Sequence, residues 1–213
     1  LREVVEGCDM LFITAGMGGG TGTGAAPIIA EIARELNILT VAVVTTPFKF
    51  EGKKRSELAD EGIVALRSCV DSLITIPNDK ILTILGNSIE MEKAFSEADK
   101  VLQGAVQGIA ELITKVGRIN LDFADVKTVM SEAGTAMMGT GMGTGIDRAE
   151  DAYENAIKSP LLDDIQITNA KGLLVNITSD KSISVDEYEM IMEKAHGLAA
   201  ENATIVIGQT QDN

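Results

Sequence analysis

Residues 15–26, AGMGGGTGTGAA, form the stretch whose composition most clearly points to chemistry. It follows an apolar stretch typical of a strand and precedes one typical of a helix, a junction where backbone N–H groups and the helix dipole favour anions. Glycines let a ligand approach the backbone closely, and Thr21 and Thr23 add hydroxyl donors or helix caps. The stretch therefore predicts a phosphate site made largely of backbone.

Two familiar nucleotide loops match this stretch only in part. The P-loop spacing is present, but Ala25 stands where the P-loop requires lysine. The dinucleotide pattern G-x-G-x-x-[GA] begins at Gly20, but the acidic residue expected about 20 positions later is absent around Thr40. A dehydrogenase of the NAD type is therefore disfavoured. A mere tight turn would need only one or two glycines.

A second candidate constellation is the segment Asn120-Leu121-Asp122-Phe123-Ala124-Asp125. Two carboxylates three residues apart at a helix start face the same way. Read structurally, Asp122 is a helix N-cap and Asp125 completes a pair resembling a capping box. Read functionally, the two carboxylates can polarise a water molecule. The residues alone leave both interpretations open.

Two other features are interpreted as structural. The glycine run at 139–145 suits a strand or loop, with Met137, Met138 and Met142 packed in the core, better than a second phosphate site. His196 has no partner at a metal-ligand spacing, and neither have the two cysteines, Cys8 and Cys69. No metal site is predicted from these residues.

The elements that must position the glycine stretch form an α/β pattern. A strand at 9–15, a helix at 25–36 and a strand at 39–45 make a βαβ unit, which implies a parallel sheet covered by helices. Further elements are expected as follows: a helix at 55–69, a strand at 72–76, short helices at 80–85 and 88–95, and a long helix at 96–116 ended by Gly117.

The pattern after this long helix predicts a smaller second α/β domain. Its expected strands are 137–145, 172–178 and 203–208, and its expected helices are 147–158 and 185–201. The predicted organisation is a first domain over 1–95, a connecting helix over 96–116 and a second domain over 117–213.

Composition excludes several classes of protein. The net charge of −14 argues against nucleic-acid binding and against adhesion to anionic lipid. No apolar run reaches the length of a membrane span, which argues against membrane insertion. Two cysteines without a disulfide pattern favour a reduced, cytoplasmic compartment.

The run Gly-Gly-Gly-Thr-Gly-Thr-Gly at 18–24 resembles the signature of the tubulin/FtsZ GTPase superfamily. The stretches VVTTPFKFEGKKR, VLQGAVQGIAELIT and INLDFADVKTVMSEAGTAMMG resemble the bacterial cell-division members of that superfamily, and the resemblance extends over the whole chain. It implies a Rossmann-like GTPase sheet, a long central helix and a smaller C-terminal α/β domain. The first strands and loops of the family's GTPase domain and the last strands of its C-terminal domain are expected to be missing, as in a protein truncated at both ends.

The resemblance also implies which residues hold GTP or GDP. Glu51 and Arg55 match positions that contact the sugar and phosphates, while Phe95 and Asp99 match residues that stack on and hydrogen-bond guanine. Mg²⁺ would be held mainly through phosphates and water. The full implied set is Gly18, Gly19, Gly20, Thr21, Gly22, Glu51, Arg55, Asn78, Phe95 and Asp99.

For catalysis, the resemblance implies that Asn120, Asp122 and Asp125 enter the nucleotide site of the next subunit and position the attacking water. The expected function is a GTPase that polymerises head to tail into the cell-division ring at mid-cell, with other division proteins and membrane tethers as partners. By itself, a chain lacking part of the site would be inactive. The alternative is a tubulin-like scaffold filament, gated by nucleotide, without significant turnover.

Overall fold

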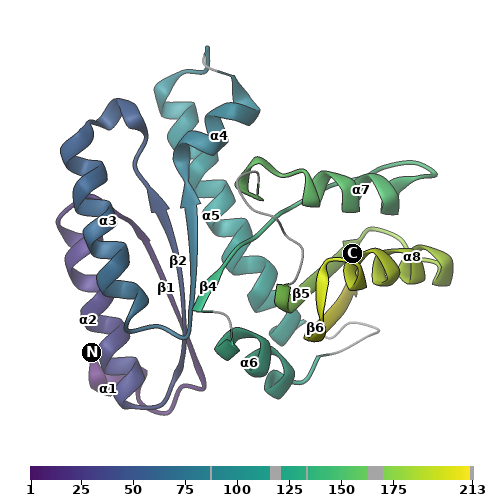
Figure 1. The fold of residues 1–213 in the computed structure, drawn as a ribbon, viewed down its shortest axis with the longest axis horizontal. Helices are drawn as coiled ribbons and strands as arrows, with labels where there is room; N and C mark the ends of the chain where they lie inside the picture. Colours follow the sequence, from purple (N-terminus) through teal and green to yellow (C-terminus); the bar gives the residue numbers. More distant parts are fainter. Residues whose placement is uncertain (87, 116–120, 133, 163–169, 212–213) are drawn as a thin grey trace. The chain divides into compact units, whose positions relative to one another are not determined.

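The computed structural model describes residues 1–86, 88–115, 121–132, 134–162 and 170–211 (Figure 1). The chain divides into two compact units, which we describe separately. Unit 1 comprises Leu1–Val106 and Ala133–Met137, and unit 2 comprises Gln107–Glu132 and Met138–Asn213. No helix in the described ranges is long and apolar enough to cross a membrane.

Unit 1 is built on a four-stranded parallel sheet. Its strand order is β1 (Met10–Gly16), β2 (Leu39–Thr46), β3 (Ser72–Pro77) and β4 (Gly134–Ala136). All residues of β2 except the last are buried, as expected for a central strand covered on both faces. The parallel sheet predicted from the sequence is therefore confirmed.

The helices of unit 1 fill the connections between these strands. Helices α2 and α3 lie together on one side of the sheet in Figure 1. Small residues, among them Ala26, Ala30 and Ala59, are buried where these two helices meet the sheet, so the backbones can approach closely. The bounds are α1 (Arg2–Val5), α2 (Thr21–Glu35), η1 (Lys49–Glu51), α3 (Lys53–Arg67) and α4 (Asn78–Leu85).

Two helix boundaries differ from the sequence-based expectation. Helix α2 begins at Thr21 rather than at 25, because the glycine run supplies its first turn. Helix α5 (Met91–Thr114) is one continuous helix, so a separate short helix over 88–95 is wrong. No glycine or proline occurs over residues 91–103, and Ala94 and Ala98, one turn apart, are buried on the same face. Gly117, the expected helix end, lies outside the described residues.

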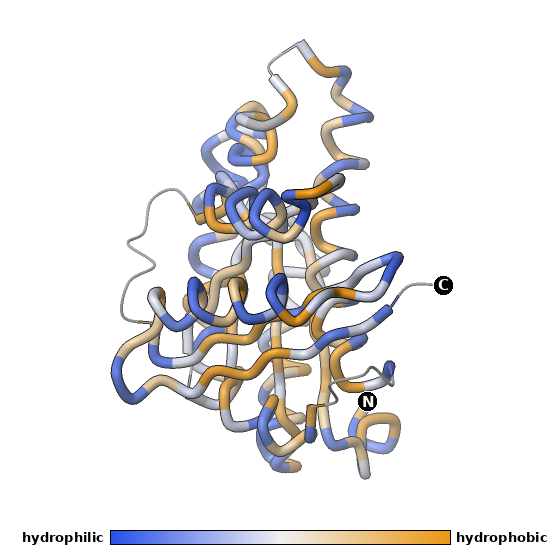
Figure 2. The backbone as a smooth tube through the Cα atoms, turned by 90° about the vertical axis from the view of Figure 1, so that its right-hand side faces the viewer, coloured by the Kyte–Doolittle hydropathy of each residue, from blue (hydrophilic) through white to orange (hydrophobic). Residues whose placement is uncertain are grey.

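Unit 2 contains a parallel pair of strands, β5 (Ala170–Ser179) and β6 (Ala199–Gln211). Helix α8 (Val185–His196) makes the crossover between them. The expected continuation of this helix to 201 is wrong, because β6 already begins at Ala199. Figure 2 shows hydrophobic and hydrophilic residues alternating along the helices, which is typical of amphipathic helices. The other elements of unit 2 are α6 (Phe123–Glu132), α7 (Arg148–Ile157) and η2 (Pro160–Leu162).

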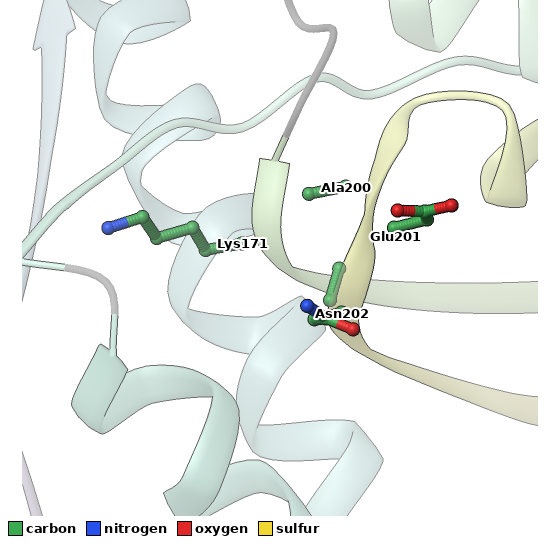
Figure 3. A pocket seen from close by; sticks show the side chains of 5 residues that line it. Lys171, Ala200, Glu201 and Asn202 are labelled. Atoms are coloured by element: carbon green, nitrogen blue, oxygen red, sulfur yellow. The ribbon is translucent and has the colours of Figure 1, made fainter.

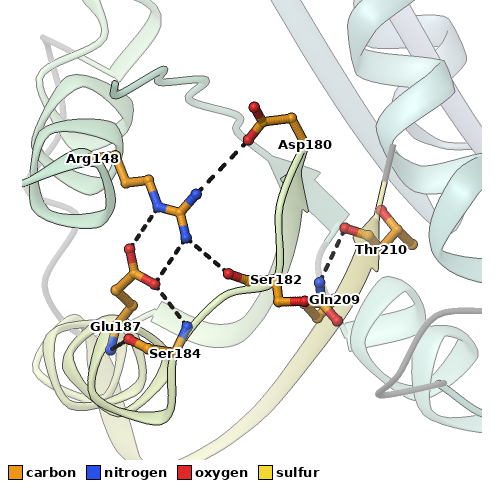
Figure 4. A network of polar contacts seen from close by, with 7 residues as sticks. All are labelled: Arg148, Asp180, Ser182, Ser184, Glu187, Gln209 and Thr210. Atoms are coloured by element: carbon orange, nitrogen blue, oxygen red, sulfur yellow. Dashed lines mark hydrogen bonds and ion pairs between the residues drawn. The ribbon is translucent and has the colours of Figure 1, made fainter. Parts of the chain in front are cut away.

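An arginine joins the N-terminal ends of α7 and α8 (Figure 4). Arg148 donates from Nε and Nη2 to the two carboxylate oxygens of Glu187, at 2.6 and 3.1 Å, and from Nη2 to the Ser182 carbonyl at 3.0 Å. Glu187 also accepts from the Ser184 N–H at 2.7 Å in a capping box. The Arg148 guanidinium, followed by the Ser184 amide, lowers the pKa of Glu187 to about 2.

The glycine run at 139–145 has no regular secondary structure, so the strand expected there is absent from residues 137–144. A Cβ added at Gly139, Gly141 or Gly143 would collide with the α7 backbone at Ala156, Ala152 and Arg148 respectively. The run therefore lies flat against α7, in agreement with a packing role. The three glycines are two residues apart, whereas the α7 residues that they meet are four residues apart. The two spacings match because two residues of extended chain rise about 6.6 Å and four helical residues about 6 Å.

The methionines of this region do not behave as core residues. Met142 lies between Gly141 and Gly143 and faces away from α7, so it is 80% exposed. Met137, which precedes the run, is 39% exposed. The expectation that they pack in a core is wrong for these two side chains. The strand near this segment is the three-residue β4, which ends before Met137.

Candidate functional site

Three loops of unit 1 meet at the carboxyl edge of the parallel sheet. Gly16 at the end of β1 pairs with Thr45, and Thr46 at the end of β2 pairs with Pro77, so the strands end side by side. The Met17 N–H donates to the Thr45 carbonyl at 2.9 Å. This edge is where open α/β sheets bind ligands.

The glycines of the first loop divide into two kinds. Gly18 has a φ of +94°, and an added Cβ there would lie 2.5 Å from the Arg55 carbonyl oxygen. At Gly22, an added Cβ would lie 2.6 Å from the Gly16 carbonyl oxygen. Gly19 and Gly20 are exposed, and an added Cβ at either would meet no atom within 4 Å. Packing therefore requires glycine at 18 and 22, whereas 19 and 20 border open space that a phosphate can occupy.

The two threonines of the loop have different surroundings. Thr21 is the first residue of α2 and is exposed, so its hydroxyl is accessible to a ligand. The Thr23 hydroxyl accepts the Gly18 N–H at 2.9 Å. Neither side chain caps α2, whose N-cap is Gly20 without a side-chain hydrogen bond. The expected capping role of the threonines is therefore wrong.

Glu51 and Arg55 come together in the second loop and the first turn of α3. Arg55 Nη1 lies 2.5 Å from Glu51 Oε2, and the other oxygen of Glu51 accepts the Phe48 N–H at 2.8 Å. The Glu51 side chain is 11% exposed and that of Arg55 is 58% exposed. Glu51 is thus held by the backbone, whereas the Arg55 guanidinium lies at Glu51 and remains largely exposed to solvent.

Asn78 begins α4 directly after β3 and is buried. Its Oδ1 atom has no hydrogen-bond partner within the described part of the chain. A buried acceptor left unpaired costs about 1–3 kcal/mol. A hydroxyl or amine group of a bound ligand would satisfy this oxygen, so the site fits a nucleotide at this position.

Phe95 belongs to a group of three aromatic rings. Its ring meets the rings of Phe48 and Phe50 edge to face, with centroids 5.1 and 6.2 Å apart. Phe95 remains 39% exposed, so part of its ring is available for stacking. Asp99, one turn later on α5, is exposed. Phe48 and Phe50 are not among the predicted site residues, although the motif PFKF places both beside Glu51.

Asp122 and Asp125 lie together in unit 2, at the first turn of α6. The Asp122 side chain accepts the Ala124 N–H at 3.2 Å and thus caps the helix, as predicted. Asp125 is exposed, and its carboxylate bonds to none of the described residues. The expectation that Asp125 completes a pair resembling a capping box is therefore wrong, because its side chain does not turn back to the Asp122 N–H. Asn120 lies outside the described residues. The Asp122 carboxylate is therefore partly engaged by the end of the helix, while the Asp125 carboxylate is accessible.

A shallow hollow in unit 2 lies near the start of β6 and is lined by Lys171, Ala200, Glu201, Asn202 and Ala203 (Figure 3). Two of these residues are alanine, and none belongs to the predicted site. Across the described ranges, no group of three or more His, Cys, Asp or Glu side chains could hold a metal ion.

The comparisons with known proteins agree with this fold and site. A model of the Tubulin/FtsZ family GTPase domain matches residues 1–86, and one of the FtsZ family C-terminal domain matches residues 134–213. The parallel sheet with its glycine-rich loop is thus that of a tubulin-like GTPase domain. The chain belongs to the FtsZ family.

Three proteins similar to this chain are themselves FtsZ proteins. The chain is 61% identical over 212 residues to the cell division protein FtsZ of Coxiella burnetii and 58% identical to that of Pseudomonas aeruginosa. Both alignments cover 100% of this chain but 55% and 54% of those proteins, so the chain spans about half the length of these curated relatives. A solved structure of an empty FtsZ dimer from M. jannaschii has a TM-score of 0.95 at 44% identity, covering 100% of this chain and 61% of that one.

Proposed function

We propose that this chain forms part of a GTP-hydrolysing protein that polymerises head to tail in bacterial cell division. One observation carries the nucleotide site: Gly19 and Gly20 border open space at the same sheet edge where the buried Asn78 Oδ1 has no partner among the described residues. Backbone N–H groups at the start of α2 would hold the phosphates, and Arg55 would offset their charge.

Guanine recognition is assigned to Phe95 and Asp99. The exposed part of the Phe95 ring can stack on a base. A carboxylate such as Asp99 can accept from both N1–H and N2–H₂ of guanine, a pair of donors that adenine lacks. When bound, Mg²⁺ supplies positive charge at the phosphates. It would be held mainly by the phosphates and water.

Hydrolysis is assigned to Asp122 and Asp125, together with Asn120, acting on the nucleotide of a neighbouring subunit. Phosphoryl transfer needs mainly a positioned water molecule and charge stabilisation, which two acidic side chains can help to provide. A head-to-tail contact that does not close on itself produces a filament. In this proposal the filament lies in the cytoplasm at mid-cell and binds membrane tethers and other division proteins.

The test separates nucleotide binding from turnover. Asp122→Asn keeps a good N-cap but removes the charge, and Asp125→Asn removes the accessible carboxylate. In the whole protein of which this chain forms part, both variants should bind GTP normally and release phosphate at least tenfold more slowly, because the attacking water is no longer positioned. Asp151→Asn, in the first turn of α7, is the matched control.

The phosphate release rate should also rise more steeply than linearly with protein concentration, because the site needs two subunits. Equal loss of binding and turnover in the two α6 variants would refute the role of these carboxylates. Filaments that form with GTP but release no phosphate would favour the scaffold alternative.

A further inference from the structure

We propose that Thr23 of α2 and Gly62 of α3 form a positioning contact that sets the shape of the phosphate loop. Neither residue is part of the predicted nucleotide set. The expected effect of this contact on nucleotide binding rests on the proposed function. The contact itself is a separate claim and can be tested without nucleotide.

The first half of the contact is the bond between Thr23 and Gly18. The Thr23 hydroxyl accepts the Gly18 N–H at 2.9 Å and thereby closes a ring across the loop. Gly18 is buried, has a φ of +94° and directly precedes Gly19 and Gly20, which border open space. The bond therefore fixes the backbone from which the two accessible glycines continue. It also removes the Gly18 N–H from the donors available to a phosphate.

The second half is the close approach of α3. Gly62 is buried, and a Cβ added there would collide with Thr23 Cγ2 and lie 2.7 Å from Met17 Cε. Cγ2 and the hydroxyl oxygen of a threonine share one carbon, so a rotation that moves the methyl group also moves the hydroxyl. The missing side chain at 62 therefore leaves Thr23 in the rotamer that can accept from Gly18.

The same helix contacts the loop at a second place. The Arg55 carbonyl oxygen of α3 lies against Gly18, where an added Cβ would be 2.5 Å away. Helix α3 thus contacts the loop through its first turn and, by way of Thr23, through Gly62. We therefore name Thr23 and Gly62 positioning residues, which need not touch the nucleotide.

The experiment uses four variants that separate the hydroxyl from the methyl group. Thr23→Val keeps the shape and removes the acceptor, while Thr23→Ser keeps the acceptor and removes Cγ2. Gly62→Ala introduces the collision. The double variant Gly62→Ala/Thr23→Ser adds the Cβ but removes the methyl group that it would strike.

The first readout is the hydrogen-exchange rate of the Gly18 amide, measured by NMR without nucleotide. Loss of one hydrogen bond should raise this rate about two- to tenfold in Thr23→Val and in Gly62→Ala. Thr23→Ser and the double variant should exchange at nearly the wild-type rate. Gly104→Ala, on the exposed side of α5 with no atom within 4 Å of the added Cβ, is the matched glycine control and should not change the rate.

The second readout is the dissociation constant for GDP, measured by competition with a fluorescent analogue. It should rise about two- to tenfold in Thr23→Val and Gly62→Ala, and return towards wild type in the double variant. Unchanged Gly18 exchange in Thr23→Val, or a double variant no better than Gly62→Ala, would overturn the contact. Faster exchange with unchanged GDP affinity would overturn its role in binding. GDP binding is measured in the whole protein of which this chain forms part. Failure of that wild-type protein to bind GDP would refute the proposed function, while the exchange rates would still decide the contact.

Discussion

The ion pair between Arg148 and Glu187 makes a sharp prediction about pH. The pKa of Glu187 lies at about 2 in the folded protein, against an ordinary value of 4.5, because it accepts hydrogen bonds from Arg148 and Ser184. A carboxyl group whose pKa is lowered by folding stabilises the protein above its unfolded pKa. That stabilisation is lost as the pH falls towards the folded pKa. The contribution should therefore decline between about pH 5 and pH 2.

The magnitude follows from the difference between the two pKa values. A difference of this size corresponds to at most about 3 kcal/mol in the free energy of unfolding. The side chains of Arg148 and Glu187 are 24% and 19% exposed, so solvent screening lowers the expected value to about 1–2 kcal/mol. Glu187→Gln should destabilise unit 2 by this amount at pH 7, because glutamine keeps the capping-box bonds but not the charge.

Tyrosine fluorescence during urea unfolding is a suitable assay. The chain has no tryptophan and two tyrosines, Tyr153 on α7 and Tyr188 on α8, which both report on unit 2. The difference between wild type and Glu187→Gln should fall by about half between pH 6 and pH 3. Glu189→Gln, an exposed change on the same helix, should produce no such trend. A Glu187→Gln difference that stays constant over this range would refute the reasoning.

Three further predictions concern the glycine contacts and the nucleotide site. Gly141→Ala should destabilise the protein by about 1–3 kcal/mol because its Cβ enters the α7 backbone, whereas Gly104→Ala should change stability by less than about 1 kcal/mol in thermal unfolding followed by circular dichroism. Asn78→Ala should leave the unfolding midpoint of the nucleotide-free protein nearly unchanged and weaken GDP binding about tenfold by calorimetry, and the reverse pattern would contradict a ligand role. Asp99→Asn should reduce the preference for GTP over ATP in competition binding, and an unchanged ratio would exclude Asp99 from base recognition.

Much of the sheet could be predicted because its strands are continuous apolar runs. The run at 39–45 is rich in β-branched residues, and the structure extends it by one residue to β2. Strand β4 could not be found in this way, because Gly-Thr-Ala carries no hydrophobic pattern and depends on its pairing with β3. The helix expected over 88–95 failed because no breaker separates it from the longer helix.

In the candidate site, too, the features that depend on local sequence could be predicted, whereas those that depend on tertiary contacts could not. Glycine content alone marked the loop, and the spacing of Asp122 and Asp125 predicted the helix cap that the structure contains. No local pattern could show that Gly18 and Gly22 are required by packing while Gly19 and Gly20 are not, because the contacting atoms come from other segments. The partner of the Thr23 hydroxyl was missed because it lies five residues back along the chain.

The flat contact between residues 139–143 and α7 has a consequence for mutational tolerance. Because backbone meets backbone there, any side chain at the three glycines should destabilise the protein, while Thr140 and Met142 between them face away and are exposed. A saturation scan should therefore show intolerant and tolerant positions in strict alternation. Such an alternation is expected of a β-strand. Here it would come from a segment that forms no β-ladder with any of the described residues.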